Sequence, residues 1–380
     1  MKNNMIKVAF STAFAFRSGN RYGEYRLQSS LVTMVLCLLA SCSSPKQEGM
    51  KDIMKLPTYS VEGLKFNQEE IISGNAWEFH RVGDNFLIFN AVPTSAALVI
   101  RMADCKELGE FVPKGMGPGE CNTPRYAGCS AGEDTIYMYD TFKFGMSEFA
   151  FPSQREESLQ YSFIRTIRST QDELHGPTCR LDNGLSVGFR LSGTRHLFSL
   201  LDERMDTIRT FGSLPLPVED DELKNFMPFQ GVMTAKGNTV FYASKLLPYM
   251  CAYEVIDANN IELKFKYNYQ EPSYTYSNGR IRMDHEKTLE AFRDIKLNRG
   301  YIWATFLGLS FAEVTEDPNG KGYCQSIILF NMKGEPLAKF ELPVKGSHFC
   351  FSKDGNQLYL FTTDSDIYVF EVNDFVKHIE

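Results

Sequence analysis

The stretch Gly83-Asp84-Asn85-Phe86-Leu87-Ile88-Phe89-Asn90 joins a turn to a short run of aromatic and branched apolar residues. This pattern returns along the rest of the chain. The later copies are TIYMYD after Glu133-Asp134, LSVGFR after Asp182-Asn183-Gly184, TVFYASK after Lys236-Gly237-Asn238, YIWATFLG after Asn298-Arg299-Gly300, and QLYLFTT after Lys353-Asp354-Gly355-Asn356. Counted from Asn85, Asp134, Asn183, Asn238, Asn298 and Asn356, the steps between copies are 49, 49, 55, 60 and 58 residues.

A repeat of this length that contains only strands and turns is typical of a β-propeller built from four-stranded antiparallel blades. The copies therefore predict an all-β, six-bladed propeller in which each copy is the second strand of a blade. Third strands are expected over residues 96–101, 146–151, 196–202, 249–257, 325–331 and 366–372. Outer fourth strands are expected after the first five of these.

The last repeat has no fourth strand of its own, because the sequence stops at Glu380 soon after the third. A strand-like segment before the first repeat, Tyr59–Phe66, has no other place in the pattern. We expect this N-terminal strand to close the ring as the outer strand of the last blade, which would remove exposed sheet edges. The predicted propeller then spans residues 57–380.

The N-terminus has the features of a targeting segment. Residues 31–40 (LVTMVLCLLA) are apolar but too few to span a membrane, which suits the core of a signal peptide. Leu39-Ala40-Ser41-Cys42 resembles the lipobox of bacterial lipoproteins, in which the cysteine is lipidated. We predict a signal peptide over residues 1–41, with an n-region extended by an upstream start, lipidation at Cys42, and a tether over 42–56. A plain secretory signal is the alternative.

Composition narrows the functional classes. The net charge is −7 and no basic run is present, which disfavours nucleic-acid binding. The seven cysteines after Cys42 are odd in number and irregularly spaced, so they do not indicate a disulfide framework. The sequence has no CxxC pair and no histidine cluster, and we predict no metal and no cofactor. We expect a monomeric propeller whose membrane contact is its N-terminal lipid.

The whole chain resembles the TolB-like six-bladed β-propeller lipoproteins. The resemblance rests on the lipobox at Cys42, the G-x-G-P-G-E turn at Gly115–Glu120 and the segment Ala291–Ile295 (AFRDI). Residues 111–149 also resemble an NHL-type blade, although Cys121 stands where the family commonly has Phe. The resemblance implies a lipid-anchored propeller facing the periplasm or the exterior, and it implies no agreed activity.

The glycine-rich turn could be taken for a phosphate loop. It lacks a following Lys-Ser/Thr and is expected to lead into a β-blade rather than a helix. We therefore interpret it as a tight structural turn in which Glu120 either caps local backbone donors or faces the channel. Its residues are Gly115, Gly117, Pro118, Gly119 and Glu120.

Polar residues near strand ends are the candidates for a ligand site, because the inner strands of a propeller surround a central channel. These candidates are Arg101, Asp140, Arg180, Arg190 and Lys245. Two stretches between predicted blades, residues 214–233 and 267–293, are longer than the repeat requires. The second carries Tyr274, Tyr276 and Arg280, which suit a glycan or a protein partner. Solvated strand ends and self-packing loops are the alternatives.

We find no catalytic residue set, because a G-x-S-x-G elbow is missing and the histidines are scattered. The sequence favours an exported, lipid-anchored propeller that binds a ligand, glycan or protein partner on one face or at the channel, without catalysis. The alternatives are a hydrolase or lyase acting on a saccharide or lactone at the channel mouth, and a structural accessory of an envelope complex. The expected location is the bacterial cell envelope, with the outer membrane favoured over the inner.

Overall fold

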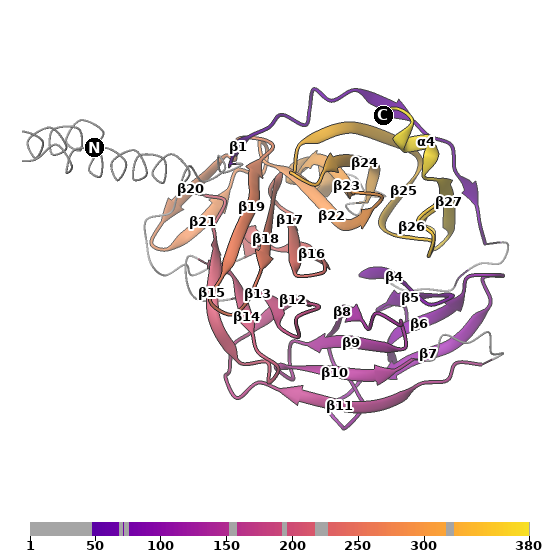
Figure 1. Cartoon of the computed structure of the whole chain (residues 1–380). Coiled ribbons are helices and arrows are strands. Elements are labelled where there is room, and N and C mark those ends of the chain that lie inside the picture. Colours follow the sequence, from indigo (N-terminus) through magenta and orange to yellow (C-terminus); the bar gives the residue numbers. More distant parts are fainter. Residues whose placement is uncertain are drawn as a thin grey trace, which may run out of the picture. The chain divides into compact units, whose positions relative to one another are not determined.

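The computed structural model describes residues 48–67, 71, 76–151, 158–191, 196–216, 227–316 and 323–379. The predicted signal peptide and lipidation site, Cys42, lie outside these residues. Within them the chain forms a β-propeller, with sheets set around a common centre (Figure 1). Strands β4, β8, β12, β16 and β22 lie nearest that centre.

Three antiparallel sheets have four strands each. The first contains β4 (Glu78–Val82), β5 (Asn85–Phe89), β6 (Ser95–Arg101) and β7 (Glu107–Pro113). The second contains β8 (Pro124–Cys129), β9 (Thr135–Asp140), β10 (Gly145–Ala150) and β11 (Ser162–Arg168). The third contains β12 (His175–Arg180), β13 (Ser186–Arg190), β14 (His196–Leu201) and β15 (Thr207–Ser213).

The fourth sheet has a fifth strand that comes from the N-terminal segment. Its four sequential strands are β16 (Gly231–Lys236), β17 (Thr239–Ser244), β18 (Tyr249–Val255) and β19 (Ile261–Asn268). Strand β1 (Glu48–Met50) adds parallel to β19, and Ile53 is buried just beyond it. Residues that the sequence places in the tether therefore belong to the folded unit.

Six further strands together with the short β2 and β3 form one eight-stranded sheet instead of two separate blades. Its strands are β22 (Leu289–Asn298), β23 (Tyr301–Ser310), β24 (Cys324–Asn331), β25 (Pro336–Phe351), β26 (Gln357–Thr362), β27 (Ile367–Glu371), β3 (Leu64–Lys65) and β2 (Thr58–Ser60). The expectation of six separate sheets is wrong here, because β25 is long enough to serve two neighbours. Its first half pairs with β24, and its second half, from Gly346 on, pairs with β26.

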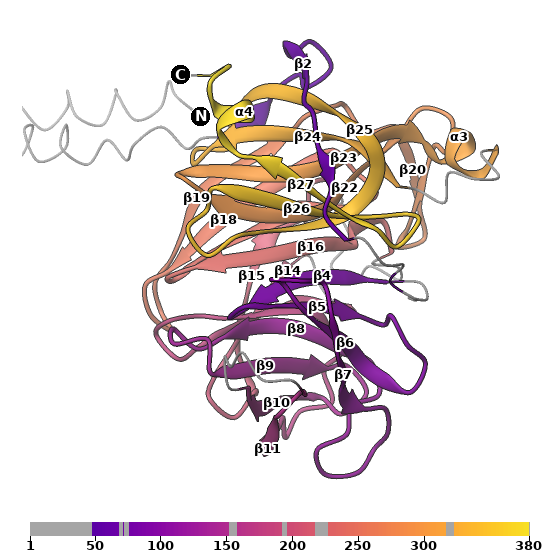
Figure 2. The ribbon, with the colours of Figure 1, turned by 90° about the vertical axis from the view of Figure 1, so that its right-hand side faces the viewer.

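The segment Tyr59–Phe66 is two short strands rather than one. Strand β2, labelled near the top of Figure 2, runs parallel to β25, whereas β3 pairs antiparallel with β27. The chain changes partner because Val61 is buried against the first half of the sheet and donates its N–H to the Glu341 carbonyl. Gly63 then passes so close to Phe370 that a Cβ would come within 2.4 Å of the ring.

Three short helical segments and one hairpin complete the described chain. The helical segments are η1 (Met227–Phe229), α3 (Phe311–Glu316) and α4 (Asn373–Val376). Strands β20 (Tyr274–Ser277) and β21 (Arg280–Met283) form a separate hairpin inside the longest predicted insertion. No described helix is long and apolar enough to cross a membrane.

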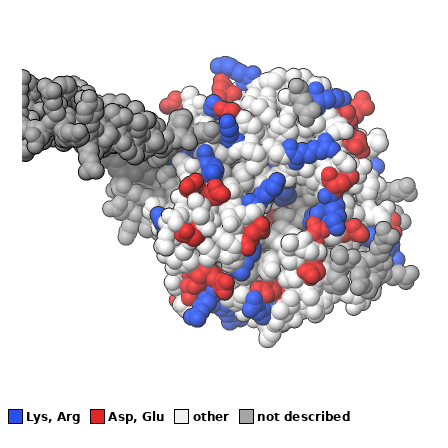
Figure 3. Space-filling model, viewed as in Figure 1, with Lys and Arg blue, Asp and Glu red and all other residues white. Residues whose placement is uncertain are grey.

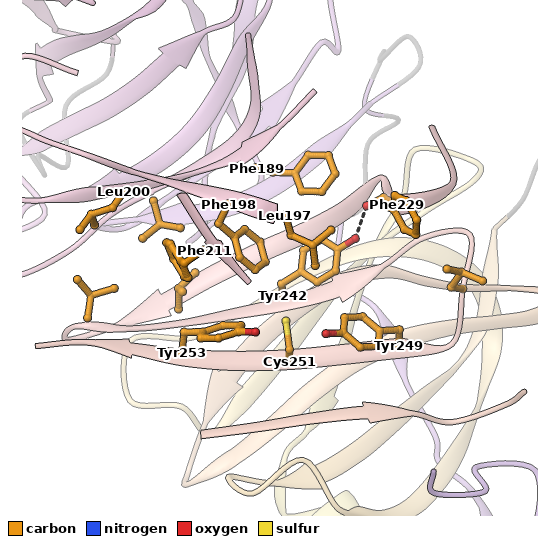
Figure 4. Packing of buried hydrophobic residues seen from close by; sticks show 14 of the residues in the cluster. Phe189, Leu197, Phe198, Leu200, Phe211, Phe229, Tyr242, Tyr249, Cys251 and Tyr253 are labelled. Carbon is orange, nitrogen blue, oxygen red and sulfur yellow. Dashed lines mark hydrogen bonds between the residues drawn. The ribbon is translucent and has the colours of Figure 1, made fainter. Parts of the chain in front are cut away.

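Buried aromatic residues hold neighbouring sheets together. Between the third and fourth sheets, the rings of Phe189 and Tyr242 stack with their centres 5.7 Å apart, and Phe198 meets Tyr242 edge-on at 5.4 Å (Figure 4). The Tyr242 hydroxyl donates a hydrogen bond to the Phe229 carbonyl. Such pairs each add about 0.5–1.5 kcal/mol beyond the burial of their surface.

Candidate functional site

The innermost strands enclose a cavity of about 250 Å³ at the centre of the propeller. The strands position its side chains by alternation, since every second residue of a strand points to the same side. Thus Glu78 and His80 of β4 line the cavity while Phe79 between them is buried in the core, and Asp294 and Lys296 of β22 line it together. Other lining residues include Trp77, Thr123, Arg125, Tyr126, Phe142, Lys245 and His348.

Glu78 connects the first two sheets across the cavity. Its carboxylate accepts hydrogen bonds from the Arg125 guanidinium at 3.1 Å and from the Tyr126 backbone N–H at 3.0 Å, and it lies 3.3 Å from His80 Nε2. Burial alone would raise the pKa of Glu78, but the His80 hydrogen bond and the Arg125 charge outweigh it and lower the pKa to about 2. Glu78 is therefore ionised and fully engaged.

His80 and Arg125 are held by aromatic rings as well as by Glu78. The His80 ring stacks on Tyr126 with ring centres 4.0 Å apart, and the Arg125 guanidinium lies 4.8 Å from the centre of the Trp77 ring. Burial and the nearby Lys296 charge lower the pKa of His80, so this ring is neutral at pH 7. The arrangement fixes the wall of the cavity where the first and second sheets meet.

Asp294 is the second carboxylate of the cavity wall, and it comes from the eight-stranded sheet. It lies 2.8 Å from Lys296 Nζ, accepts the backbone N–H groups of Ile295 and Phe349, and lies 3.9 Å from His348 Nδ1. Burial lowers the pKa of His348 to about 3 against the pull of Asp294, so His348 is neutral. Like Glu78, Asp294 has its oxygens occupied by protein donors.

Lys245 is the exception among the charged groups of the cavity. It follows β17, and its backbone is fixed by hydrogen bonds to Gln230 and Ala291. Within the described part of the chain, its Nζ has no hydrogen bond and no ion pair within 4.0 Å. Burial and the charges of Arg125 and Arg293 lower the pKa of Lys245 to about 8, although Glu78 and Asp294 oppose the shift. Lys245 is thus a cation without a direct counter-ion.

Two uncharged groups of the cavity are also available to a ligand. The Phe142 side chain, in the turn after β9, remains 58 % exposed although it lines the cavity. The Thr123 hydroxyl is buried and has no hydrogen-bond partner in the described structure. An exposed aromatic ring, an unused hydroxyl and a cation without a direct counter-ion on the wall of one cavity are features of a binding site rather than of a packed core.

A second cavity of about 550 Å³ lies on the other side of His80, Tyr126, Met233 and Lys296, which line both. Cations outnumber carboxylates on its wall. The lining cations are Arg81, Arg180, Lys236, Lys296, Arg299 and Lys353, and the lining acids are Asp182 and Asp354. On the face in Figure 3, Lys and Arg side chains lie beside Asp and Glu around the hollowed middle.

The structure separates the residues that the sequence groups as candidate ligand contacts. Lys245 lines the first cavity and Arg180 the second. Arg101 lies in a third cavity and pairs with Asp104 at 2.6 Å. The Asp140 side chain is fully buried and accepts the backbone N–H groups of residues 122, 123 and 142. Arg190 is buried against Glu173 at 3.0 Å.

The tyrosines of the longest insertion pack inward. Tyr274 and Tyr276 on β20 lie against the core cluster between the third and fourth sheets, as the self-packing alternative expects. Arg280 lies opposite Ser277 at the turn of the hairpin and is exposed. None of these three residues is among the residues that line the two central cavities.

The glycine-rich turn is held by its own backbone and side chains. The Gly117 N–H donates to the Glu120 carboxylate at 2.7 Å, and Lys143 Nζ donates to the carbonyls of Gly117 and Glu120. Gly119 has a φ of +73°, which a side chain would strain, and Pro118 precedes it. Glu120 therefore caps a local donor.

Most lining residues of the first cavity are not among the candidates from sequence. Trp77 and Glu78 come from the first repeat, Arg125 and Phe142 from the second and His348 from the last, so these residues form no linear motif. The only usable signal is polar residues at alternate positions just before a repeat, as in Glu78-Phe79-His80. Among the described residues, no three His, Cys, Asp or Glu side chains gather closely enough to hold a metal ion.

Comparison with known proteins supports the fold. No protein-family description and no curated protein matches the chain. A candidate exported protein from Bacteroides fragilis has a similar structure, with a TM-score of 0.54 and 11 % identity, covering 86 % of this chain and 98 % of its own. A member of the DUF4221 family from Bacteroides vulgatus has a TM-score of 0.50 and 12 % identity, covering 82 % and 98 %. At these identities the likeness concerns the fold alone.

Proposed function

We propose that this protein is an exported, lipid-anchored propeller that binds a small ligand in its central channel. The signal-like segment and the cysteine at position 42 support export and lipid anchoring, and the structural likeness to an exported protein of Bacteroides fragilis supports export. The likeness to TolB-like lipoproteins belongs to the same proposal. We propose the bacterial cell envelope as its location, with the outer membrane favoured over the inner.

Six blades and a closed ring are part of this proposal. We take the eight-stranded sheet as two blades that meet within β25, because its first half pairs with β24 and its second half with β26. The first and last of the six blades pack against each other through Phe79 and Phe361, whose ring centres are 5.6 Å apart, and Phe86 and Tyr359, at 5.0 Å. Strand β3 on β27 would then be the N-terminal strand that closes the ring.

One observation carries the proposed binding function. Lys245 brings a charge into the central cavity, and no described group neutralises it by direct contact. A partly buried charge without a partner costs free energy, and a ligand that supplies the counter-charge offsets that cost. Convergent polar groups in a concave site make this cavity the default binding site of the propeller.

The chain contains a built-in probe for this binding. It has two tryptophans, of which Trp77 lines the cavity and Trp303 is fully buried elsewhere. We expect that titrating full-length, detergent-purified protein with a panel of small acids, bases and neutral sugars changes the fluorescence of Trp77. The Trp77→Phe variant keeps a ring beneath Arg125 and should lose the response while still binding. Compounds that raise the melting temperature without changing Trp77 fluorescence would place the ligand elsewhere.

The lipid anchor needs a separate test. The Cys42→Ser variant should lose incorporation of labelled fatty acid and leave the membrane fraction of the expressing bacterium. A plain secretory signal predicts no labelling in either protein.

A propeller hydrolase or lyase is the second candidate function. The observation in its favour is Lys245, whose pKa of about 8 leaves some neutral amine near pH 7 that could accept a proton. Glu78 is a weak base because its pKa is about 2. Product formation from uronic-acid saccharides or lactones, lost in Lys245→Met, would favour this candidate.

A further inference from the structure

We infer that the ligand of the central channel is a small monocarboxylate, with its acid group against Lys245 and an apolar ring face against Phe142. This inference rests on the proposed binding function and names the class of molecule bound. Four features of the first cavity carry it: the charge of the wall, the hydrogen-bond donors, the exposed ring and the volume.

The charge of the cavity calls for an anion. Its wall carries the cations Arg125, Lys245 and Lys296 against the carboxylates Glu78 and Asp294. Glu78 is occupied by Arg125 and Asp294 by Lys296, at 3.1 and 2.8 Å. The Lys245 ammonium is left over, so its counter-charge has to come from a bound molecule.

The donors of the cavity suit one carboxylate better than a phosphate. Phosphate sites in proteins gather several backbone N–H groups or a free guanidinium fork. Here one guanidinium nitrogen of Arg125 donates to Glu78, the guanidinium lies over the Trp77 ring, and the N–H of Tyr126 also donates to Glu78. Lys245 and the unpartnered Thr123 hydroxyl remain, which together match a singly charged group.

Phe142 indicates that the part of the ligand away from the carboxylate has an apolar face. A phenyl group that is 58 % exposed on a cavity wall loses its contact with water when an apolar face covers it. The cavity volume of about 250 Å³ lies below the ~300 Å³ at which drug-sized pockets begin. The ligand is therefore monomer-sized, with one ring or a short aliphatic body.

The surroundings favour an anion over a cation as well. The chain as a whole carries −7, yet cations outnumber carboxylates on the walls of both central cavities. Clefts lined with one sign of charge raise the local concentration of the opposite sign. Basic side chains gathered in the channel of an otherwise acidic protein favour the entry of negatively charged molecules there.

The same site sets the pH range of binding. Lys245 faces Glu78 and Asp294, which favour its charge, and Arg125, Arg293, Lys296 and His348, which do not. Because its pKa is about 8, the ammonium is present at pH 7 and is lost as the pH rises. Carboxylate affinity should fall about tenfold for each pH unit above that value.

The experiment compares matched acids and neutral molecules by Trp77 fluorescence and calorimetry on the full-length protein in detergent. The probes are D-glucuronate against D-glucose and cyclohexanecarboxylate against cyclohexanol. We expect each acid to bind at least about tenfold more tightly than its neutral partner. The two acid arms distinguish a sugar acid from a hydrocarbon acid.

Variants locate the acid group. Lys245→Met should lose about tenfold or more in acid affinity, whereas Lys236→Met, an exposed lysine of the second cavity, should lose none. Lys245→Arg keeps the charge and should extend acid binding beyond pH 9, a readout that does not depend on Lys245→Met folding well. Phe142→Ala should weaken cyclohexanecarboxylate more than acetate.

Three results would overturn the inference, and they differ in what they leave standing. If neutral molecules change Trp77 fluorescence and their acids bind no better, channel binding stands and the ligand class is wrong. If acids bind equally well to Lys245→Met, the acid group lies elsewhere. If no probe changes Trp77 fluorescence, the acid class is rejected, and a hit from the wider panel would still support the proposed function.

Discussion

Glu78 organises the first cavity through contacts that require its negative charge. Its carboxylate receives Arg125, the Tyr126 N–H and His80, and its side chain is only 19 % exposed. The low pKa of about 2 means that the folded chain holds the ionised form far more strongly than the unfolded chain does. Acid should therefore weaken the fold through this residue.

We predict that Glu78 makes the stability of the protein fall in acid. The folded-state pKa lies below the ordinary value of 4.5, so the contribution is complete above pH 4.5 and is lost as the pH falls toward 2. Urea unfolding should show wild type more stable than Glu78→Gln at pH 7, with about 2 kcal/mol of that advantage gone at pH 3.

The control for this prediction is Glu107→Gln, which changes an exposed carboxylate on the first residue of β7. The unfolding free energy of this variant should differ little from that of wild type, and by the same amount at pH 7 and pH 3. An equal Glu78→Gln difference at pH 7 and pH 3 would show that the Glu78 charge does not stabilise the fold.

The sequence could point to a channel site but could not choose its residues. A polar residue near a strand end can face the channel, as Lys245 does, or satisfy local backbone donors, as Asp140 does. It can also find a buried partner, as Arg190 does in Glu173. Which outcome applies depends on distant repeats, and a single sequence does not reveal which of them come together.

At the scale of strands, the sequence predicts the second and third strands well because their signal is local. Each combines a turn with alternating apolar residues, and the six copies of the pattern fall on β5, β9, β13, β17, β23 and β26. The innermost strands are harder. Strand β12 reads HGPTCR and β16 reads GVMTAK, since one side of each strand lines a polar channel and few apolar residues are needed.

Asn67 fixes the N-terminal segment to the hairpin formed by β26 and β27. Its side-chain amide donates to Asp366 at 3.0 Å, and its oxygen accepts the Ile367 N–H at 2.7 Å. We predict that Asn67→Ala costs about 1–3 kcal/mol in unfolding free energy, because it leaves the buried Ile367 N–H without this acceptor. Unfolding of wild type and variant in denaturant measures this loss of free energy. Asn122→Ala, at an exposed site, is the control and should change stability little.

For the whole propeller, β2 and β3 attach the N-terminal segment to strands that are far away in sequence. Strand β2 attaches residues 58–60 to β25, and β3 attaches residues 64–65 to β27. Phe66 then packs between Phe86 of the first sheet and Tyr359 of β26, with ring centres 6.3 and 5.1 Å away. A closed ring differs from an open stack because the loss of one contact between its ends loosens every blade.

This difference gives a test of ring closure. Residues 58–66 are replaced by a Gly/Ser linker of the same length, which keeps the N-terminal attachment while removing β2, β3, Val61 and Phe66. We predict that the melting temperature of the whole unit falls by roughly 5–10 °C in a single transition, because several buried groups are lost together. Hydrogen exchange should speed up in β4–β7 as well as in β26 and β27.

The control is a Gly/Ser replacement of the exposed turn at residues 257–260, which should speed up hydrogen exchange only near that turn. If exchange in β4–β7 is unchanged while only β27 becomes less protected, the segment covers one edge and the ring is not closed through it.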